Sequence, residues 1–231
     1  MIPYRLDLAG GWLDQPFISS IFSGSVITLS ILSEKEYNKR SGLATSTRDT
    51  LIKLHSLGIM PEDQIEAAKL LFRYDNKPGT VNISGAQDSI GLCVKGLSRH
   101  FYNGRYWPKS IEICQDEKIL DWIESHIYLK ALPERKENYD VFEDKNINAS
   151  DIQGLSECSD KCWKAIMEMN LSDFAYYVTY TYEYQKHLFP NIETNGPIPQ
   201  CLGYKLAGAG GGGYVIMINE DPCGERIKVR R

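Results

Sequence analysis

A run of glycines near the end of the chain is the segment best suited to binding an anion. Residues 208–213 read GAGGGG, and the apolar stretch 214–219 (YVIMIN) follows at once. Glycine costs about 0.5–1 kcal/mol relative to alanine inside a regular element, so such a cluster needs a reason. Without Cβ atoms, successive N–H groups can converge on an anion, and a buried strand would hold them rigidly. A flexible linker or a tight entry into the strand is the alternative.

A second segment suited to phosphate, SGLATST (41–47), lies immediately before a predicted helix. A helix N-terminus has free N–H groups and the positive end of the helix dipole, and both favour phosphate. The hydroxyls of Ser46 and Thr47 could contact phosphate or Mg²⁺, whereas the alternative is ordinary capping of the helix by Thr45 or Ser46. Neither glycine-containing segment is a Walker A sequence or a GxGxxG that opens a helix, so a P-loop ATPase or a Rossmann dehydrogenase is not supported.

Aspartates near glycines are candidates for handling an alcohol proton. Asp88 lies in the turn-rich stretch 79–91, and Asp14 follows the double glycine at 10–11. Phosphoryl transfer needs mainly positioning and charge neutralisation, so a carboxylate within hydrogen-bond reach of the attacking hydroxyl would serve. Turn chemistry is the alternative for both aspartates. Arg5 projects from a predicted strand, and a surface arginine is its alternative role.

The elements that must position these residues change type along the chain. Alternation and β-branched residues predict early strands at 4–9 and 25–32. Helical periodicity and capping signals predict helices at 45–57, 61–74, 116–125, 149–169 and 171–188. Later strands are predicted at 127–132, 139–142 and 214–219. Strands early, helices in the middle and strands late favour an α+β fold over a doubly wound parallel sheet.

Length and charge limit the possible functions. The chain has 231 residues, a net charge of −4 and a pI of about 5.6. These values suit one large domain or two small ones and argue against non-specific nucleic-acid binding. No apolar run is long enough to cross a bilayer, and the first residues lack a secretory signal. We therefore expect a soluble, cytoplasmic protein with no membrane partner, whose six cysteines are reduced.

Two other patterns favour core packing over chemistry. Cys158 and Cys162 are four residues apart, but no second pair with ligand spacing accompanies them. A helical core stripe is therefore favoured over a metal pair. The tyrosine-rich segment 174–184 could stack on nucleic-acid bases, but its aromatic residues follow one helical stripe with few basic residues between them.

Four segments, in order from residue 3 to residue 218, resemble motifs of the GHMP kinases, the superfamily of galactokinase, mevalonate kinase and homoserine kinase. PYRLDLAGGWLDQP (3–16) resembles the first motif, in the form nearest to the fucokinase and heptose-phosphate kinase branch. SGLATST resembles the second motif, which is the phosphate loop. SGAQDSIG (84–91), followed by NGRYWP (103–108), resembles the stretch that carries an aspartate near the reacting hydroxyl. KLAGAGGGGYVIMI resembles the third motif.

The resemblance implies a two-lobed α+β fold. An S5-like β/α lobe would span 1–108 and contain the cleft for ATP and substrate. A ferredoxin-like lobe would span 109–231 and carry the glycine-rich loop. Roughly thirty residues, about two strands and their turns, separate the first and second motifs here, so the N-terminal lobe is expected to be shortened.

The implied activity is ATP- and Mg²⁺-dependent phosphoryl transfer to a hydroxyl of a small-molecule sugar or sugar phosphate. Asp88 would orient or deprotonate the hydroxyl, and Arg5 would keep that carboxylate charged and steady the transferring group. The substrate would contact Asp14, Gly11 and Trp12. The residues implied for ATP phosphates are Gly42, Leu43, Ala44, Thr45, Ser46, Thr47, Gly208, Gly210, Gly211 and Gly212, and those for Mg²⁺ are Ser46 and Asp75.

Three departures from the family pattern support rival functions. Ala44 stands where the family has a glycine, and Arg48 stands where a small residue is common. The family's glutamate for Mg²⁺ has no counterpart; Asp75 lies in that window, and a solvated aspartate at a helix end is its alternative role. One rival is a catalytically degenerate domain that binds sugar or nucleotide without transfer. The other is a protein-interaction module that uses the same cleft for a partner.

Overall fold

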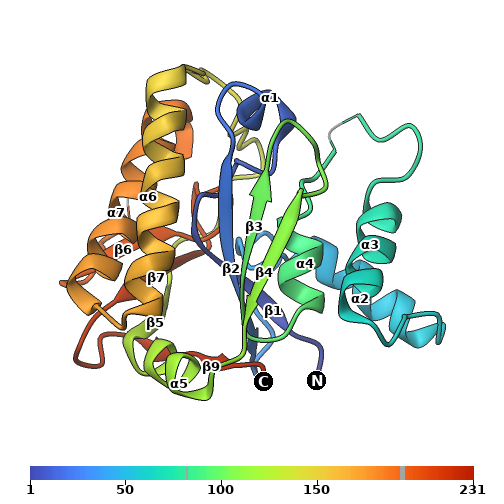
Figure 1. Ribbon diagram of the computed structural model, residues 1–231, viewed down its shortest axis with the longest axis horizontal. Helices are drawn as coiled ribbons and strands as arrows, with labels where there is room; N and C mark the ends of the chain where they lie inside the picture. Colours follow the sequence, from blue (N-terminus) through green and yellow to red (C-terminus); the bar gives the residue numbers. More distant parts are fainter. Residues whose placement is uncertain (82, 193–195) are drawn as a thin grey trace.

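β2 (Gly24–Leu32) is the central strand of the first of two sheets. The computed structural model describes residues 1–81, 83–192 and 196–231. β2 pairs in antiparallel fashion with β1 (Tyr4–Ala9), β3 (Leu97–Tyr102) and the C-terminal β9 (Lys228–Val229), and β3 continues the sheet to β4 (Ser110–Cys114). β1 and nearly all of β2 are buried, because helices lie on opposite faces of this sheet (Figure 1).

The second sheet carries the glycine-rich segment. Its strand order is β6 (Gly203–Leu206), β7 (Tyr214–Ile218), β5 (Ile127–Ala131) and β8 (Glu225–Arg226), and its paired strands are antiparallel. The long helices α6 (Ala149–Met167) and α7 (Leu171–Leu188) pack on each other; α6 contacts β2 and α7 contacts β6. The helix pair therefore joins the two sheets. β4 and β9 lie beyond residue 108 in the sequence but belong to the first sheet.

The helices α2 (Thr45–Ser56), α3 (Gln64–Asp75) and α4 (Gln87–Cys93) form a group on the other side of the first sheet (Figure 1). α3 begins later than predicted because Asp63 caps it, accepting hydrogen bonds from two backbone N–H groups at 2.9 Å. α5 (Glu117–His126) is capped in the same way by Asp116. Two short elements, α1 (Pro16–Ser19) and the 3₁₀ helix η1 (Pro190–Ile192), complete the secondary structure of the described residues.

Several local predictions are wrong, and each has a physical reason. Residues 139 and 140 are irregular and 141 and 142 lie in a turn, instead of forming a strand, and the Asp140 carboxylate accepts from the Phe142 N–H at 2.8 Å. Asp88 lies in the first turn of α4 instead of in a loop. The sequence did not suggest α4 because it is short and contains Gly91, where a Cβ would lie 2.2 Å from Cγ of Arg5. β3 went unpredicted because its buried polar residue His100, which bonds Thr28 at 3.2 Å, interrupts the apolar pattern.

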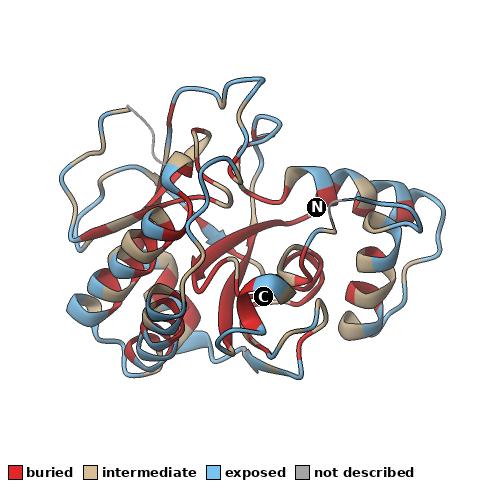
Figure 2. Cartoon of the chain, turned by 90° about the horizontal axis from the view of Figure 1, so that it is seen from above, coloured by how far each residue is buried: buried red, intermediate tan, exposed pale blue. Residues whose placement is uncertain are grey.

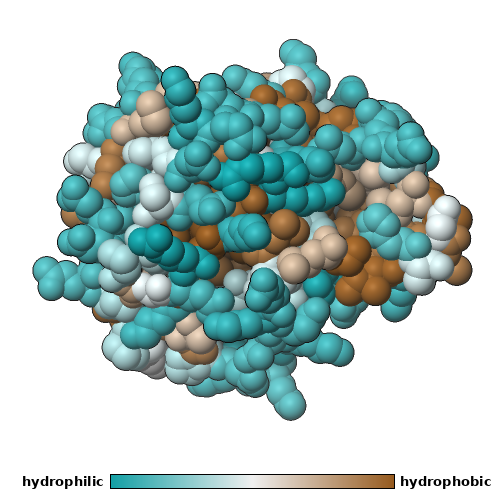
Figure 3. Space-filling view, turned by 90° about the horizontal axis from the view of Figure 1, so that it is seen from below, coloured by the Kyte–Doolittle hydropathy of each residue, from teal (hydrophilic) through white to brown (hydrophobic). Residues whose placement is uncertain are grey.

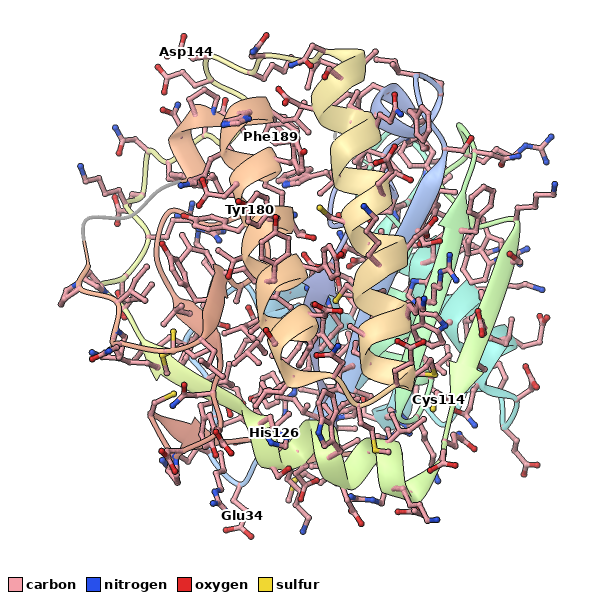
Figure 4. All side chains as sticks on the ribbon, turned by 60° about the vertical axis from the view of Figure 1, so that its left-hand side comes forward. Glu34, Cys114, His126, Asp144, Tyr180 and Phe189 are labelled. Carbon is pink, nitrogen blue, oxygen red and sulfur yellow. The ribbon has the colours of Figure 1, made fainter. Side chains whose placement is uncertain are left out.

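Buried residues lie on the strands and on the inner faces of the helices, while the outer faces of the helices are exposed (Figure 2). All six cysteines are free, and Cys158 and Cys162 are buried in α6, which confirms the core interpretation. The described residues contain no cluster of three or more His, Cys, Asp or Glu side chains placed to hold a metal. On α7, Phe174 and Thr181 are buried, and the labelled Tyr180 lies on the outer face (Figure 4).

The molecular surface is mixed in character. The face seen in Figure 3 is predominantly hydrophilic, and polar side chains interrupt its apolar patches. None of the helices among the described residues combines the length and the apolar character needed to span a membrane. The two ends of the chain lie near each other at one end of the first sheet (Figure 1).

Candidate active site

The two glycine-containing segments, far apart in the sequence, lie against each other. A Cβ on Gly42 would lie 2.1 Å from the carbonyl oxygen of Ala207, and one on Gly213 would lie 2.5 Å from that of Ser41. Both glycines have positive φ, at +83° and +90°. Only glycine allows this approach without displacing backbone, so the glycines of both segments are needed to bring the loops together. The two segments predicted to bind phosphate are therefore adjacent in the structure.

The N-terminus of α2 has no side-chain cap. Its N-cap residue is Ala44, which has left-handed backbone angles (φ 59°, ψ 34°) and makes no capping hydrogen bond. The alternative in which Thr45 or Ser46 caps this helix is therefore wrong. The first N–H groups of α2 remain without an intrahelical or side-chain acceptor, and together with the helix dipole they favour an anion.

A cavity of about 320 Å³ opens beside the start of α2 and is called the basic cavity here. Its lining residues are Arg5, Lys39, Arg40, Gly42, Ala44, Thr45, Ser46, Asp49, Asp88, Arg135, Gly208 and Ala209. Four of these side chains are cationic and two are carboxylates. Its volume is at the small end of the roughly 300–1,000 Å³ range of small-molecule sites. The wall is thus suited to a polyanion with a cation bound beside it.

Two guanidinium groups in the basic cavity have N–H groups with no protein acceptor. Arg135 donates from Nε to the Gly210 carbonyl at 2.8 Å, but its buried Nη2 has no hydrogen-bond partner among the described residues. Nε and Nη1 of Arg5 also lack one, and Arg5 is 3% exposed. Burial lowers the pKa of both arginines. Buried N–H groups without acceptors cost about 1–3 kcal/mol each, so the arrangement calls for an anionic ligand.

A second cavity of about 240 Å³ adjoins the first and is called the acidic cavity here. Its lining residues are Arg5, Asp7, Gly11, Trp12, Asp14, Gln15, Ile83, Ser84, Gly85, Gln87, Asp88, Phe142, Gly208 and Ala209. Asp14 is 1% exposed and accepts from Nε2 of Gln87 at 3.1 Å. Burial raises the pKa of Asp14 to about 6. Gly85 is needed beside it, because a Cβ there would lie 1.7 Å from the Asp14 carboxylate.

Asp7 and Lys205 form a buried ion pair behind the acidic cavity. The Lys205 Nζ atom donates to the Asp7 carboxylate at 2.8 Å and to the Asp7 carbonyl at 2.9 Å, and Lys205 has no exposed surface. Asp7 Oδ1 is buried and has no hydrogen-bond partner among the described residues. The pair links β1 of the first sheet to β6 of the second. Neither residue was predicted from the sequence. The available signal was a charged residue inside a strand: Asp7 lies within the predicted strand 4–9, and Lys205 lies within a short strand next to the glycine-rich segment.

Arg5 and Asp88 lie where the two cavities meet. Together with Gly208 and Ala209 they line both cavities. Arg5 Nη2 donates to Asp88 Oδ1, and the Asp88 side chain is 23% exposed. The structure therefore places Arg5 beside Asp88, as the resemblance implied. A carboxylate at this position can face a ligand in either cavity.

An aromatic group closes the acidic cavity on one side. The Trp12 ring lies 4.5 Å from Phe189 and 5.6 Å from Phe142, measured between ring centroids. The labelled Phe189 lies at the end of α7 (Figure 4). Trp12 has φ +82°, which is unusual for a bulky residue and marks backbone strain at the cavity.

Several residues predicted for the site lie elsewhere or are already engaged. The N–H of Gly211 donates to the Ile192 carbonyl at 2.9 Å and that of Gly210 to Ala207 at 3.4 Å, so neither amide is free for phosphate. Gly212 approaches the Pro133 carbonyl. Leu43 and Thr47 are buried, and neither lines a cavity.

The predicted Mg²⁺ ligand Asp75 lies outside both cavities. Its carboxylate accepts from the hydroxyls of Thr47, at 2.5 Å, and Thr50, at 3.1 Å, which ties α3 to α2. Asp49 lines the basic cavity instead, and sequence reasoning missed it. The available signal was its spacing of three residues from Ser46, which places both on one face of a helix.

Arg48, which stands where the family pattern has a small residue, has a structural role. Its guanidinium lies 4.1 Å from the Tyr4 ring centroid, pairs with Glu36 at 3.0 Å and donates to the Ile2 carbonyl. The side chain thus binds the start of β1 and lines neither cavity.

No protein-family model matches the chain, and no curated protein matches its sequence. Solved structures do match. A D-glycero-D-manno-heptose 1-phosphate kinase from Bacteroides thetaiotaomicron has a TM-score of 0.61 and 14% identity, over 94% of this chain and 87% of that one. The phosphomevalonate kinase of Streptococcus pneumoniae has a TM-score of 0.62 and 14% identity, over 95% and 90%. The galactokinase of Lactococcus lactis, solved with galactose, has a TM-score of 0.54 and 15% identity, over 95% and 84%.

These structural neighbours are kinases of the GHMP superfamily. The chain therefore has the α+β fold of the GHMP kinases that its motifs predicted. Identities of 14–15% establish the fold, and the activity has to be argued from the site.

Proposed function

We propose that the chain is a cytoplasmic, ATP-dependent kinase that phosphorylates a hydroxyl of a small sugar-like molecule. The observation behind the proposal is the junction of the two cavities at Arg5 and Asp88. A nucleotide polyphosphate in the basic cavity and an alcohol in the acidic cavity would meet there. The kinase names of the structural neighbours and the match of the four motifs support the same reaction class.

The donor set of the basic cavity fits Mg-ATP. The uncapped start of α2 and the unpartnered N–H groups of Arg5 and Arg135 suit phosphate oxygens. Ser46 and Asp49 offer a hydroxyl and a carboxylate, and Mg²⁺ is usually held by one or two carboxylates together with substrate phosphates. When bound, Mg-ATP supplies the phosphoryl group and neutralises part of its charge.

The chain's own residues position and neutralise the reacting groups. Asp14 and the neighbouring amide side chains orient the acceptor in the acidic cavity. Asp88 would accept the proton of the acceptor hydroxyl as that oxygen bonds to the γ-phosphorus and the bond from the γ-phosphorus to the bridging oxygen of ADP breaks, which releases ADP. Arg5, whose Nε and Nη1 atoms have no hydrogen-bond partner among the described residues, would stabilise the charge on the transferring phosphoryl oxygens.

An assay of ADP release across a panel of hexoses, heptoses and their phosphates tests the proposal. Asp88→Asn should lower kcat by about 10²- to 10⁴-fold, the usual contribution of a general base, while ATP still binds. Asp221→Asn, at an exposed position between β7 and β8, is the matched control and should keep full activity. If Asp88→Asn turned over at the wild-type rate, the assigned role of Asp88 would be wrong.

A degenerate binding domain is the second candidate, and the second motif favours it. Ala44 is strained, and the Thr47 hydroxyl is bonded to Asp75 instead of facing the cavity. For this candidate, Mg-ATP at one hundred times its Kd should stabilise the fold by about 2.7 kcal/mol, with no release of ADP in the presence of any sugar. ADP release that depends on Asp88 would exclude it.

A further inference from the structure

We propose that the acceptor bound in the acidic cavity is an uncharged polyol, a free sugar without phosphate or carboxylate groups. This inference rests on the proposed function and narrows it, because the fold is shared by kinases of both free and phosphorylated substrates. The inference follows from the charges of the cavity wall and from the hydrogen bonds that its side chains can form.

The ion pairs of the acidic cavity leave one of its carboxylates, that of Asp14, without a direct ion pair among the described residues. Asp88 is paired with Arg5, and Asp7 is paired with Lys205. Asp14, which is 1% exposed, accepts a hydrogen bond from the amide of Gln87. Among the described lining residues, Arg5 is the only cation, whereas Asp7, Asp14 and Asp88 supply three carboxylates. An acceptor that carried a phosphate into this cavity would therefore bring more negative charge to a wall that is already negative, and like charges brought together disfavour binding.

The hydrogen-bonding capacity of the wall matches hydroxyl groups. An ionised carboxylate can only accept hydrogen bonds, and three of them line the cavity. Sugar hydroxyls can donate to each, whereas the oxygens of a phosphate dianion cannot. Asp7 Oδ1 and Gln87 Oε1 are buried acceptors with no donor among the described residues. The Trp12 and Phe142 rings add a flat apolar wall suited to the C–H face of a sugar ring.

One cation lies near the rim and provides the competing possibility. The Lys145 ammonium is 5.7 Å from the Phe142 ring centroid, on an exposed side chain that does not line the cavity. A phosphate that reached out past Phe142 would meet this lysine. Lys145→Ala therefore separates the two cases. It should leave the turnover of a free sugar within twofold of the wild-type rate, whereas it would weaken the binding of a phosphorylated acceptor.

The test compares each sugar with its own monophosphates. D-mannose, L-fucose, D-galactose and a D-manno-heptose are assayed with Mg-ATP beside their 1-phosphates and, where the sugar has the hydroxyl, their 6- or 7-phosphates. Two phosphate positions are used so that the acceptor hydroxyl stays free in at least one compound. We expect one free sugar to have a kcat/KM at least 100-fold above any of its monophosphates. Equal or better turnover of a monophosphate would overturn the inference while leaving the kinase proposal intact.

A binding arm keeps the inference testable if transfer fails. Calorimetry on Asp88→Asn should show a free sugar binding at least 100-fold more tightly than its monophosphates. That result without any ADP release in the wild type would support the inference and defeat the kinase proposal. Binding of monophosphates only, or of no sugar at all, would overturn the inference. Asp14→Asn should weaken binding of the free sugar at least tenfold. It should also reduce the ratio between the affinity for the free sugar and the affinity for its monophosphates. The control Asp221→Asn should change neither the affinity nor the ratio.

Discussion

The acidic and basic cavities share a wall but are built from different parts of the fold. The acidic cavity takes its charges from buried residues, Asp7 on β1 and Asp14 just beyond it. The basic cavity takes its cations partly from exposed loop positions, Lys39 and Arg40. Exposed charges are screened by salt within about 10 Å at 0.1 M ionic strength, whereas buried ones are screened much less. We therefore expect acceptor binding to be insensitive to salt, whereas nucleotide binding should weaken as salt is added.

The greatest change in stability should follow from removing the cation of the buried Asp7–Lys205 pair. Lys205→Met leaves the Asp7 carboxylate buried without its cation, and removal of one partner of a buried pair costs about 3–5 kcal/mol. Urea unfolding should show this loss in the free energy of unfolding. The double variant Asp7→Asn/Lys205→Met should recover much of it, because no unpaired charge remains. A loss below about 1 kcal/mol in the single variant would mean that the pair is not buried as described.

The next prediction concerns the affinity of the basic cavity for ATP. Arg135→Gln removes a guanidinium whose Nη2 awaits an acceptor, so KM for ATP should rise by about tenfold to a hundredfold, equivalent to roughly 1.4–2.8 kcal/mol. KM for the acceptor should not change, because Arg135 lines only the basic cavity. Initial-rate kinetics at 50 and 300 mM salt would measure both. Lys136→Gln, its exposed neighbour outside both cavities, is the control. An acceptor KM that rose in parallel would show that the cavities are not separate.

A smaller effect uses the raised pKa of Asp14. Burial lifts the pKa of this carboxyl from 3.8 to about 6, so the folded state holds its proton more tightly than the unfolded state. The resulting stability is present below pH 4 and is lost as the pH rises through 6, amounting to about 1.4 kcal/mol between pH 5 and pH 7.5.

Urea unfolding of the wild type and of Asp14→Asn at those two pH values isolates this contribution. The wild type should lose about 1.4 kcal/mol relative to the variant on going from pH 5 to pH 7.5. The difference between the wild type and Asp221→Asn should stay constant. If the difference in the free energy of unfolding between the wild type and Asp14→Asn did not change with pH, or changed in the opposite direction, the pKa of Asp14 would not be raised in the folded protein.

The sequence predicted the acidic side better than the basic side, for a physical reason. Asp14, Gly11 and Trp12 lie together because they follow one another at the end of a single strand, so local sequence placed them. The basic cavity depends on which amides remain free after the loops pack. Gly210 and Gly211 match the third motif, yet their N–H groups are used by backbone carbonyls of Ala207 and Ile192. No local pattern indicates such long-range hydrogen bonds.

The charged residues that escaped prediction share a cause as well. Asp7 and Lys205 are almost two hundred residues apart, and only the packing of the two sheets brings them together. Asp49 was overlooked because the spacing of the family motif pointed to Asp75, which in the structure bonds two threonine hydroxyls of α2. The order of most elements followed from the periodicity of apolar residues. In α4 a glycine interrupts this periodicity, and in β3 a buried polar residue interrupts it.

The smallest effect concerns backbone strain at non-glycine residues with positive φ, which are Trp12 in the acidic wall and Arg40 and Ala44 in the basic wall. Left-handed backbone costs an L-residue about 1–2 kcal/mol. Ala44→Gly relieves this cost, and the greater freedom of glycine in the unfolded chain offsets about 0.5–1 kcal/mol of the gain. The free energy of unfolding should therefore rise by about 0.5 kcal/mol. Ala67→Gly, inside α3 with ordinary helical geometry, should instead lower it by about 1 kcal/mol. Two losses of similar size would show that Ala44 is not left-handed, and the strain assigned to the basic cavity would have to be withdrawn.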